Sequence, residues 1–269
     1  MIKKSLLPLA LGGFGIGMTE FVMMGILPDI AGGLDITIPQ AGYLITAYAL
    51  GVVVGAPTLV SLVAKRPPRS VLIWFMLMFA VFNALSALAP NFGLMLVSRF
   101  LAGLPHGAFF GVGAVVASRL ADEGKVAAAM ATMFTGLTLA NVIGVPLGTY
   151  LGHNFSWRLV FLIVAAIGLL TAISLRQWVP VIEARPSAGF RKDLGIFRKP
   201  GLWMALAITS IGTGGFFAWF SYIAPLLTDL SRFAPGQIPM IMTVVGVGMT
   251  VGVVLGGRLA DRFAPIHAI

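Results

Sequence analysis

The chain of 269 residues is 58% hydrophobic and only 10% charged, with a net charge of +9 at pH 7 and no cysteine. In soluble domains roughly a quarter of all residues are charged, so this composition excludes an ordinary soluble enzyme or binding module. The lack of cysteine excludes disulfides and thiolate metal sites, and the three histidines are too scattered to indicate a metal cluster, so we expect no cofactor.

Eight apolar segments follow one another along the chain, each long enough to cross roughly 30 Å of hydrocarbon as a helix. A Lys3-Lys4 pair before the first segment resembles a signal peptide, but the apolar run is too long and lacks a small-residue cleavage site, so we expect a retained helix. The predicted helices are 5–30, 39–63, 70–89, 93–117, 127–152, 157–179, 201–228 and 236–257. The sequence therefore predicts an all-α membrane protein.

The basic residues set the expected orientation. Placing the N-terminus in the cytoplasm puts fifteen of the eighteen Lys and Arg residues on the cytoplasmic side, all except Arg99, Arg158 and Arg232. Because positive charge accumulates in cytoplasmic loops, we expect a multi-pass protein of the bacterial inner membrane with its N-terminus inside. The same rule explains the basic net charge without nucleic acid.

Internal repetition predicts two lobes. Gly15, Gly17 and Pro28 recur 197 positions later as Gly212, Gly214 and Pro225. We expect a six-helix N-terminal lobe at 1–179, a basic cytoplasmic linker at 180–200, and the first two helices of an incomplete C-terminal lobe at 201–269. Parallel repeats of six helices form one known transporter plan, on which about four further helices would belong to the full-length, monomeric protein.

Two ionisable side chains fall well inside predicted helices, where a charge costs free energy, so each of them is a candidate for a functional role. Counting ~1.5 Å per residue from the helix ends places Glu20 and Arg99 at similar depth in the outer half of the membrane. A carboxylate beside a fixed cation can exchange a proton as a cavity opens and closes, which favours a proton or substrate site. A static ion pair that only fixes helix packing and an unpaired placement of the two charges are the alternatives.

The segment around Arg99 carries further polar and small residues. Arg99, Gly103, His106 and Gly107 follow i, i+4, i+7, i+8 spacing and so share one helical face. His106 could titrate near neutral pH or simply bond a neighbouring helix. In the fifth segment, small residues at intervals of four favour close packing, Pro146 permits a kink and Asn141 could reach the cavity; its packing residues are Gly144, Pro146 and Gly148.

The seventh segment has a Gly-rich start and an aromatic end closed by Pro225. This pattern suits a bending gate with a stacking surface, although aromatic packing at the membrane interface is the common alternative. The expected substrate-cavity residues are Tyr48, Trp219, Ser221 and Tyr222.

Several stretches resemble the major facilitator superfamily, in particular its drug:proton antiporter branch with bacterial arabinose and sugar efflux permeases. They are Thr19–Pro28 for the first helix, Tyr48–Pro57 for the second, Arg99–Gly111 for the fourth, and Gly144–Gly148, with a looser ending, for the antiporter motif of the fifth. The resemblance implies two lobes rocking about a cavity lined by helices one, four, seven and ten. It also implies proton coupling through Arg99 with an acid such as Glu20.

The chain departs from that family in one gating loop. Lys65 stands before Arg66 where the family has an acid, whereas Asp261 and Arg262 keep the usual pair after the eighth helix. We expect the latch to be altered in the first half and intact in the second.

We expect a secondary transporter that exports sugars or drugs by proton antiport, with lipid, protons and a small molecule as its partners. A symporter or facilitator of the same fold, or a truncated chain that transports nothing, are the alternatives. A membrane enzyme is disfavoured because the sequence lacks HExxH, GxSxG and cysteine.

Overall fold

The computed structural model describes the backbone of residues 3–183 and 199–262 and the side chains up to Gly252. The described residues are helical throughout apart from short connections. Eight of their helices are long and apolar enough to cross a membrane, which confirms the eight predicted segments. These spans are Lys4–Gly25, Ile38–Val63, Pro68–Leu88, Phe92–Leu120, Val126–Asn154, Trp157–Trp178, Pro200–Phe220 and Pro235–Gly252. Most of the predicted linker at 180–200 lies outside the described residues.

The first span is a broken helix rather than one straight rod. A 3-10 turn η1 (Lys4–Leu6) leads into α1 (Leu7–Gly25), and α2 (Leu27–Leu34) follows after a break at Ile26. The break coincides with Pro28 near the start of α2, where proline is tolerated because its missing N–H would have no helical partner. A capping box between Thr37 and Gln40 then starts α3 (Ile38–Val63).

Four more spans complete the part of the bundle that holds the main core. They are α4 (Pro68–Leu88), α5 (Phe92–Leu120), the composite of α6 (Val126–Leu139), η2 (Ala140–Gly144) and α7 (Val145–Asn154), and α8 (Trp157–Trp178). The η2 segment is a π-helical turn. Pro146 has no N–H to donate to the carbonyl of Val142. Just before the proline, the backbone hydrogen bonds therefore change from the α-helical i to i−4 pattern to the π-helical i to i−5 pattern, as in the bond from the Val145 N–H to the Ala140 carbonyl. The sequence predicted that Pro146 permits a kink, and the structure has a π-turn directly before this proline.

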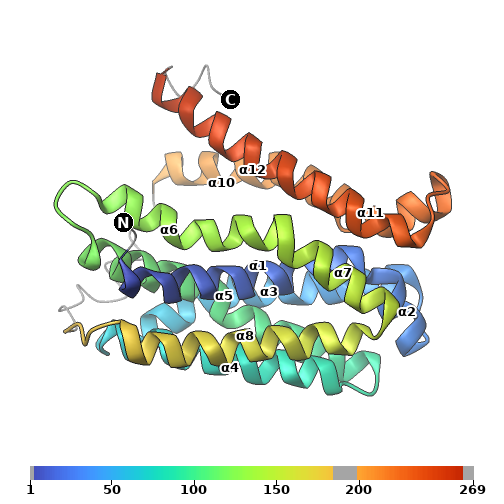
Figure 1. The fold of residues 1–269 in the computed structure, drawn as a ribbon, viewed down its shortest axis with the longest axis horizontal. Coiled ribbons are helices and arrows are strands. Elements are labelled where there is room, and N and C mark those ends of the chain that lie inside the picture. The colour runs from blue at the N-terminus through green and yellow to red at the C-terminus, as the bar shows by residue number, and fades with distance from the viewer. Residues whose placement is uncertain (1–2, 184–198, 263–269) are drawn as a thin grey trace.

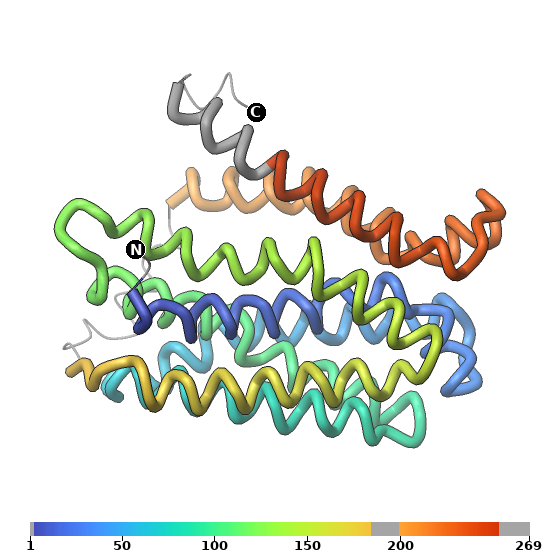
Figure 2. Tube along the Cα trace, in the orientation of Figure 1, coloured from blue at the N-terminus to red at the C-terminus, as the bar shows by residue number. Residues whose placement is uncertain are grey.

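The last two spans lie along one side of this bundle (Figure 1). They comprise α10 (Pro200–Phe220), α11 (Ile223–Pro225), a second π-turn η4 (Leu226–Leu230), η5 (Pro235–Gln237) and α12 (Ile238–Arg262). Figure 2 shows α12 meeting the bundle beside α7. A second core cluster joins Phe21, Met24 and Val145 to Phe220 and Met242, while α10 buries only Phe220 of its own residues.

The helices α3 and α5 form the most extensive packing contact among the described helices. A Cβ atom on Gly51 would collide with the carbonyl oxygen of Phe100, and one on Gly103 would collide with the carbonyl oxygen of Tyr48. Glycine is required at both positions because the two backbones approach each other directly. The close approach fixes Tyr48 of α3 over the middle of α5.

Basic residues gather at one end of the bundle. Lys3 pairs with Asp122 at 2.5 Å and donates to the carbonyl of Leu120, and its hydrogen bond lowers the pKa of Asp122. Arg69 and Arg119 donate to the carbonyls of Arg176 and Glu183. The N-terminus and three loops therefore meet at the same end, as the charge count required.

Candidate functional site

Arg99 is the largest fully buried side chain among the described residues, with 1% of its surface exposed. Its Nη1 donates to Thr19 Oγ1 at 3.0 Å and its Nη2 donates to the Thr19 carbonyl at 3.2 Å. The guanidinium also lies 4.4 Å from the centre of the Tyr48 ring and 5.4 Å from that of Phe161. Since an isolated charge inside a membrane is costly, these contacts explain how α5 can hold a cation there.

Thr19 and Asn83 extend this anchoring into a third helix. Thr19 Oγ1 donates to Asn83 Oδ1 at 2.6 Å, and Asn83 Nδ2 donates to the Phe79 carbonyl at 2.8 Å within α4. Both side chains are fully buried. The sequence did not single them out, although an asparagine in the apolar third segment was a usable signal. Arg99 is thus fixed from α1 and α4 together.

Tyr48 joins Arg99 to His106. Its hydroxyl lies 3.0 Å from His106 Nδ1, and the same ring stacks under the Arg99 guanidinium. Both partners therefore face α3, as the i, i+7 spacing predicted. The hydrogen bond also bears out the alternative that His106 is bonded by a neighbouring helix, and that helix is part of the site.

Glu20 faces the same space without forming the direct ion pair. No oxygen of Glu20 comes within 4.0 Å of a basic nitrogen in the part of the chain that the structure describes. Instead, Glu20 and Arg99 both line a cavity of about 280 Å³. Its remaining walls are Met24, Ile45, Tyr48, Ala49, Val52, Val53 and Phe217. The Nε atom of Arg99 is buried and has no hydrogen-bond partner among the described residues.

The C-terminal helices contribute a different residue to this cavity from those that the sequence predicted. Phe217 of α10 lines it and stacks on Phe21, with ring centres 6.1 Å apart. Trp219 is 52% exposed and contacts other aromatic rings of α10, while the Tyr222 hydroxyl lies against Gly42. Neither these two residues nor Ser221 lines the cavity. Phe217 lies two positions before Trp219, so helix rotation decides which aromatic faces inward.

The fifth-span residues lie at packing contacts. Asn141 donates to the carbonyl of Leu137 in its own helix, and its carbonyl lies against Gly246 of α12. Gly144 packs on Phe14 and Gly148 on Val22 of α1, beside the buried Pro146. Asn141 therefore borders the contact with α12 rather than the cavity.

Gly107 and Arg66, two further predicted packing and gating residues, do not line the cavity. Gly107 packs against Ala56 of α3, where an added Cβ would come within 2.8 Å of the Ala56 Cβ. Arg66 lies at the basic end of the bundle between α3 and α4. The side chains of Asp261 and Arg262 lie outside the described residues.

Known proteins are similar to this chain in sequence. AraJ of Escherichia coli (strain K12) is 42% identical over 266 residues, covering 99% of this chain and 68% of its own length. The inner membrane transport protein YdhP of the same organism is 45% identical over 261 residues, covering 97% and 67%. A chloramphenicol resistance protein of Streptomyces lividans is 33% identical over 258 residues, covering 94% and 66%.

The fold is also that of a solved transporter. A bacterial homologue of the human lysosomal transporter Spinster, in its inward-facing and occupied conformation, has a TM-score of 0.76 at 20% identity, with 97% of this chain and 61% of that chain aligned. The chain thus spans about two thirds of the length of these proteins. The model of the Major Facilitator Superfamily matches residues 9–269, and the chain belongs to that family of multi-pass membrane transporters.

Proposed function

We propose that this chain exports small amphipathic organic molecules in exchange for protons, by alternating access across the bacterial inner membrane. The observation that carries the proposal is the unpaired Glu20 carboxylate beside a rigidly held Arg99 in one cavity. A carboxylate in this position can bind a proton when the cavity is open and can release it when a cationic substrate approaches or when closure brings Glu20 nearer to Arg99. Fixed Arg99 supplies the counter-charge throughout.

The cavity walls favour amphipathic substrates over sugars. A sugar needs several convergent hydrogen-bond partners, and most of the lining is aliphatic or aromatic. The Tyr48 hydroxyl is already bonded to His106, so Glu20 and Arg99 supply the polar contacts. The named resistance of the Streptomyces lividans relative to chloramphenicol, a small organic drug, supports export as the direction.

The orientation belongs to the same proposal. The loops that meet at the basic end of the bundle bring Lys3, Arg69 and Arg119 together. Because cytoplasmic loops are enriched in Lys and Arg, we place this end and the N-terminus inside.

Glu20→Gln tests the coupling role. In inverted vesicles energised by a proton gradient, we expect drug accumulation to fall at least tenfold, about the effect of losing ~1.4 kcal/mol of coupling. Substrate-induced proton release, followed with a pH-sensitive dye, should disappear. The matched control is Glu123→Gln, which makes the same change at an exposed residue of the α5–α6 loop and should transport normally.

Two results would contradict the proposal. Proton-driven accumulation that is unchanged in Glu20→Gln would remove Glu20 from coupling. Substrate movement in the same direction as the protons would identify a symporter, the second reading of the fold.

A further inference from the structure

A groove opens between α3 and α4 at the basic end of the bundle. Both helices pack on α5 but make little contact with each other, so their ends stand apart. Two adjoining cavities, of about 590 and 160 Å³, occupy the gap and share Val63, Arg66 and Val71. The larger is completed by Leu62, Ser70 and Trp74, and the smaller is floored by α5 through Gly111, Val112, Val115 and Arg119.

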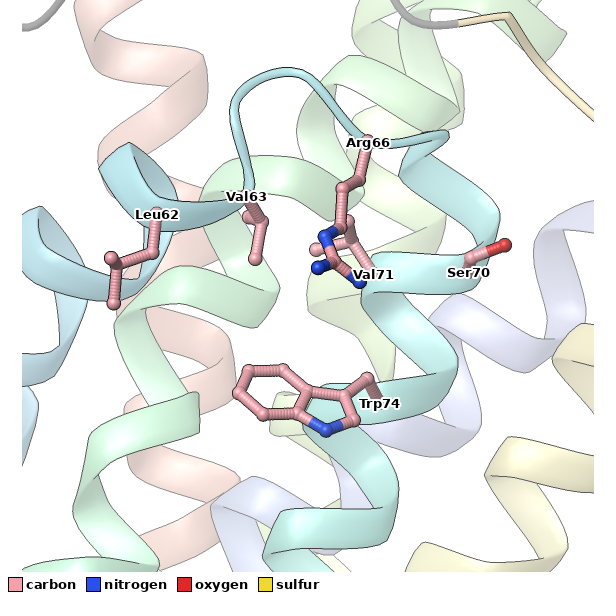
Figure 3. Close-up of a pocket in the computed structure, with 6 residues that line it drawn as sticks. All are labelled: Leu62, Val63, Arg66, Ser70, Val71 and Trp74. Carbon is pink, nitrogen blue, oxygen red and sulfur yellow. The ribbon is translucent and has the colours of Figure 1, made fainter.

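Arg66 is the cation that lines both cavities of this groove. Figure 3 shows that the Arg66 side chain extends from the α3–α4 loop into the groove, with its guanidinium directed toward the Trp74 indole. The neighbouring Arg69 and Arg119 donate to main-chain carbonyls, whereas the Arg66 side chain has no hydrogen bond or ion pair within residues 3–183 and 199–252. No acidic side chain lines either cavity. Among the described residues, the groove therefore offers positive charge that no acidic side chain neutralises.

The walls below Arg66 are apolar and open to the outside. Leu62 is 76% exposed and Trp74 is 47% exposed, and both belong to membrane spans. Tryptophan prefers the boundary between headgroups and hydrocarbon. Leu62 lies one residue before the end of α3, whereas Trp74 lies deeper, six residues inside α4, so Arg66 and Leu62 lie on the headgroup side of Trp74. A soluble anion would gain nothing from these walls, whereas a lipid would fill them.

We propose that this groove binds an anionic phospholipid, with its phosphate on Arg66 and one acyl chain between Leu62 and Trp74. Arginine forms paired hydrogen bonds to phosphate, and basic pockets between membrane helices on the cytoplasmic side suit anionic headgroups. The proposal depends on the membrane spans and not on proton coupling, so it stands or falls separately from the transport mechanism.

Lipid selectivity tests the site. The chain is placed in phosphatidylcholine vesicles, and the association of spin-labelled phosphatidylglycerol is compared with that of spin-labelled phosphatidylcholine. We expect Arg66→Gln to lower the preference for phosphatidylglycerol about fivefold at this site, the effect of one basic residue at an anionic surface. Lys65→Gln is the matched control, because Lys65 is the exposed neighbour with the same charge and lines neither cavity.

The control and two further comparisons separate a lipid site from a merely basic surface and from a soluble-anion site. Arg66→Lys, which keeps the charge without the paired donors, should retain an intermediate preference. An equal loss in Lys65→Gln and Arg66→Gln would show general surface attraction and overturn the proposal, as would no loss in either. Displacement of the labelled lipid by inorganic phosphate at constant ionic strength would assign the groove to a soluble anion instead.

Discussion

Arg99→Lys is expected to lower proton-driven transport by about 10- to 100-fold while the chain stays folded. Arg99 reaches two oxygens of Thr19 and covers the Tyr48 ring at the same time. A lysine ammonium has no planar fork, so it cannot make both contacts and stack. Losing one hydrogen bond to a charged group costs roughly 1.5–3 kcal/mol, which gives the expected range. The measurement is substrate-dependent proton flux in proteoliposomes.

Arg158→Lys is the matched control for this prediction. Arg158 also donates to two carbonyls, those of Ala87 and Ala89, and its guanidinium lies 4.2 Å from the Trp157 ring. It has the same kind of anchoring as Arg99 but does not line the cavity. Arg158→Lys should lower thermal stability by a similar amount and leave proton flux intact. If the two variants lost flux equally, the Arg99 effect would be one of stability alone.

The spans could be predicted from the sequence because the cost of burying polar groups in hydrocarbon acts on each segment separately. The shared helical face of Arg99 and His106 could also be predicted, because it follows from helical periodicity within one segment. Both features needed no knowledge of neighbouring helices. The structure confirms the spans by the length and composition of its helices, and it confirms the shared face through Tyr48, which contacts both side chains.

The partners of these residues could not be predicted because they depend on how helices rotate and cross. Equal depth made a Glu20–Arg99 ion pair possible, but Thr19 precedes Glu20 by one residue and faces the guanidinium instead. A rotation of ~100° per residue separates the two outcomes. A two-residue difference, ~200° of helix rotation, puts Phe217 rather than Trp219 into the cavity.

The contact between α3 and α5 sets up the whole site, and Gly103→Ala should break it. A Cβ at Gly103 would meet the Tyr48 carbonyl and, at 3.1 Å, the Val52 amide nitrogen. Both are backbone atoms that cannot rotate aside, so α3 must move and take Tyr48 away from Arg99 and His106. Overpacking of this kind costs about 1–3 kcal/mol. We expect a lower midpoint of thermal unfolding in detergent and a loss of proton flux.

Gly111→Ala makes the opposite prediction on the same helix. There the added Cβ would meet a single side-chain atom of Val60 at 4.0 Å, which is ordinary contact. Alanine favours a helix over glycine by up to ~1 kcal/mol, so Gly111→Ala should be as stable as the parent or more so. Helix propensity acts equally at both positions, and the difference between the variants therefore measures the backbone contact alone. If Gly103→Ala unfolded at the same temperature as Gly111→Ala, α3 and α5 would not need to touch, and Tyr48 could not be the residue that holds Arg99 and His106 together.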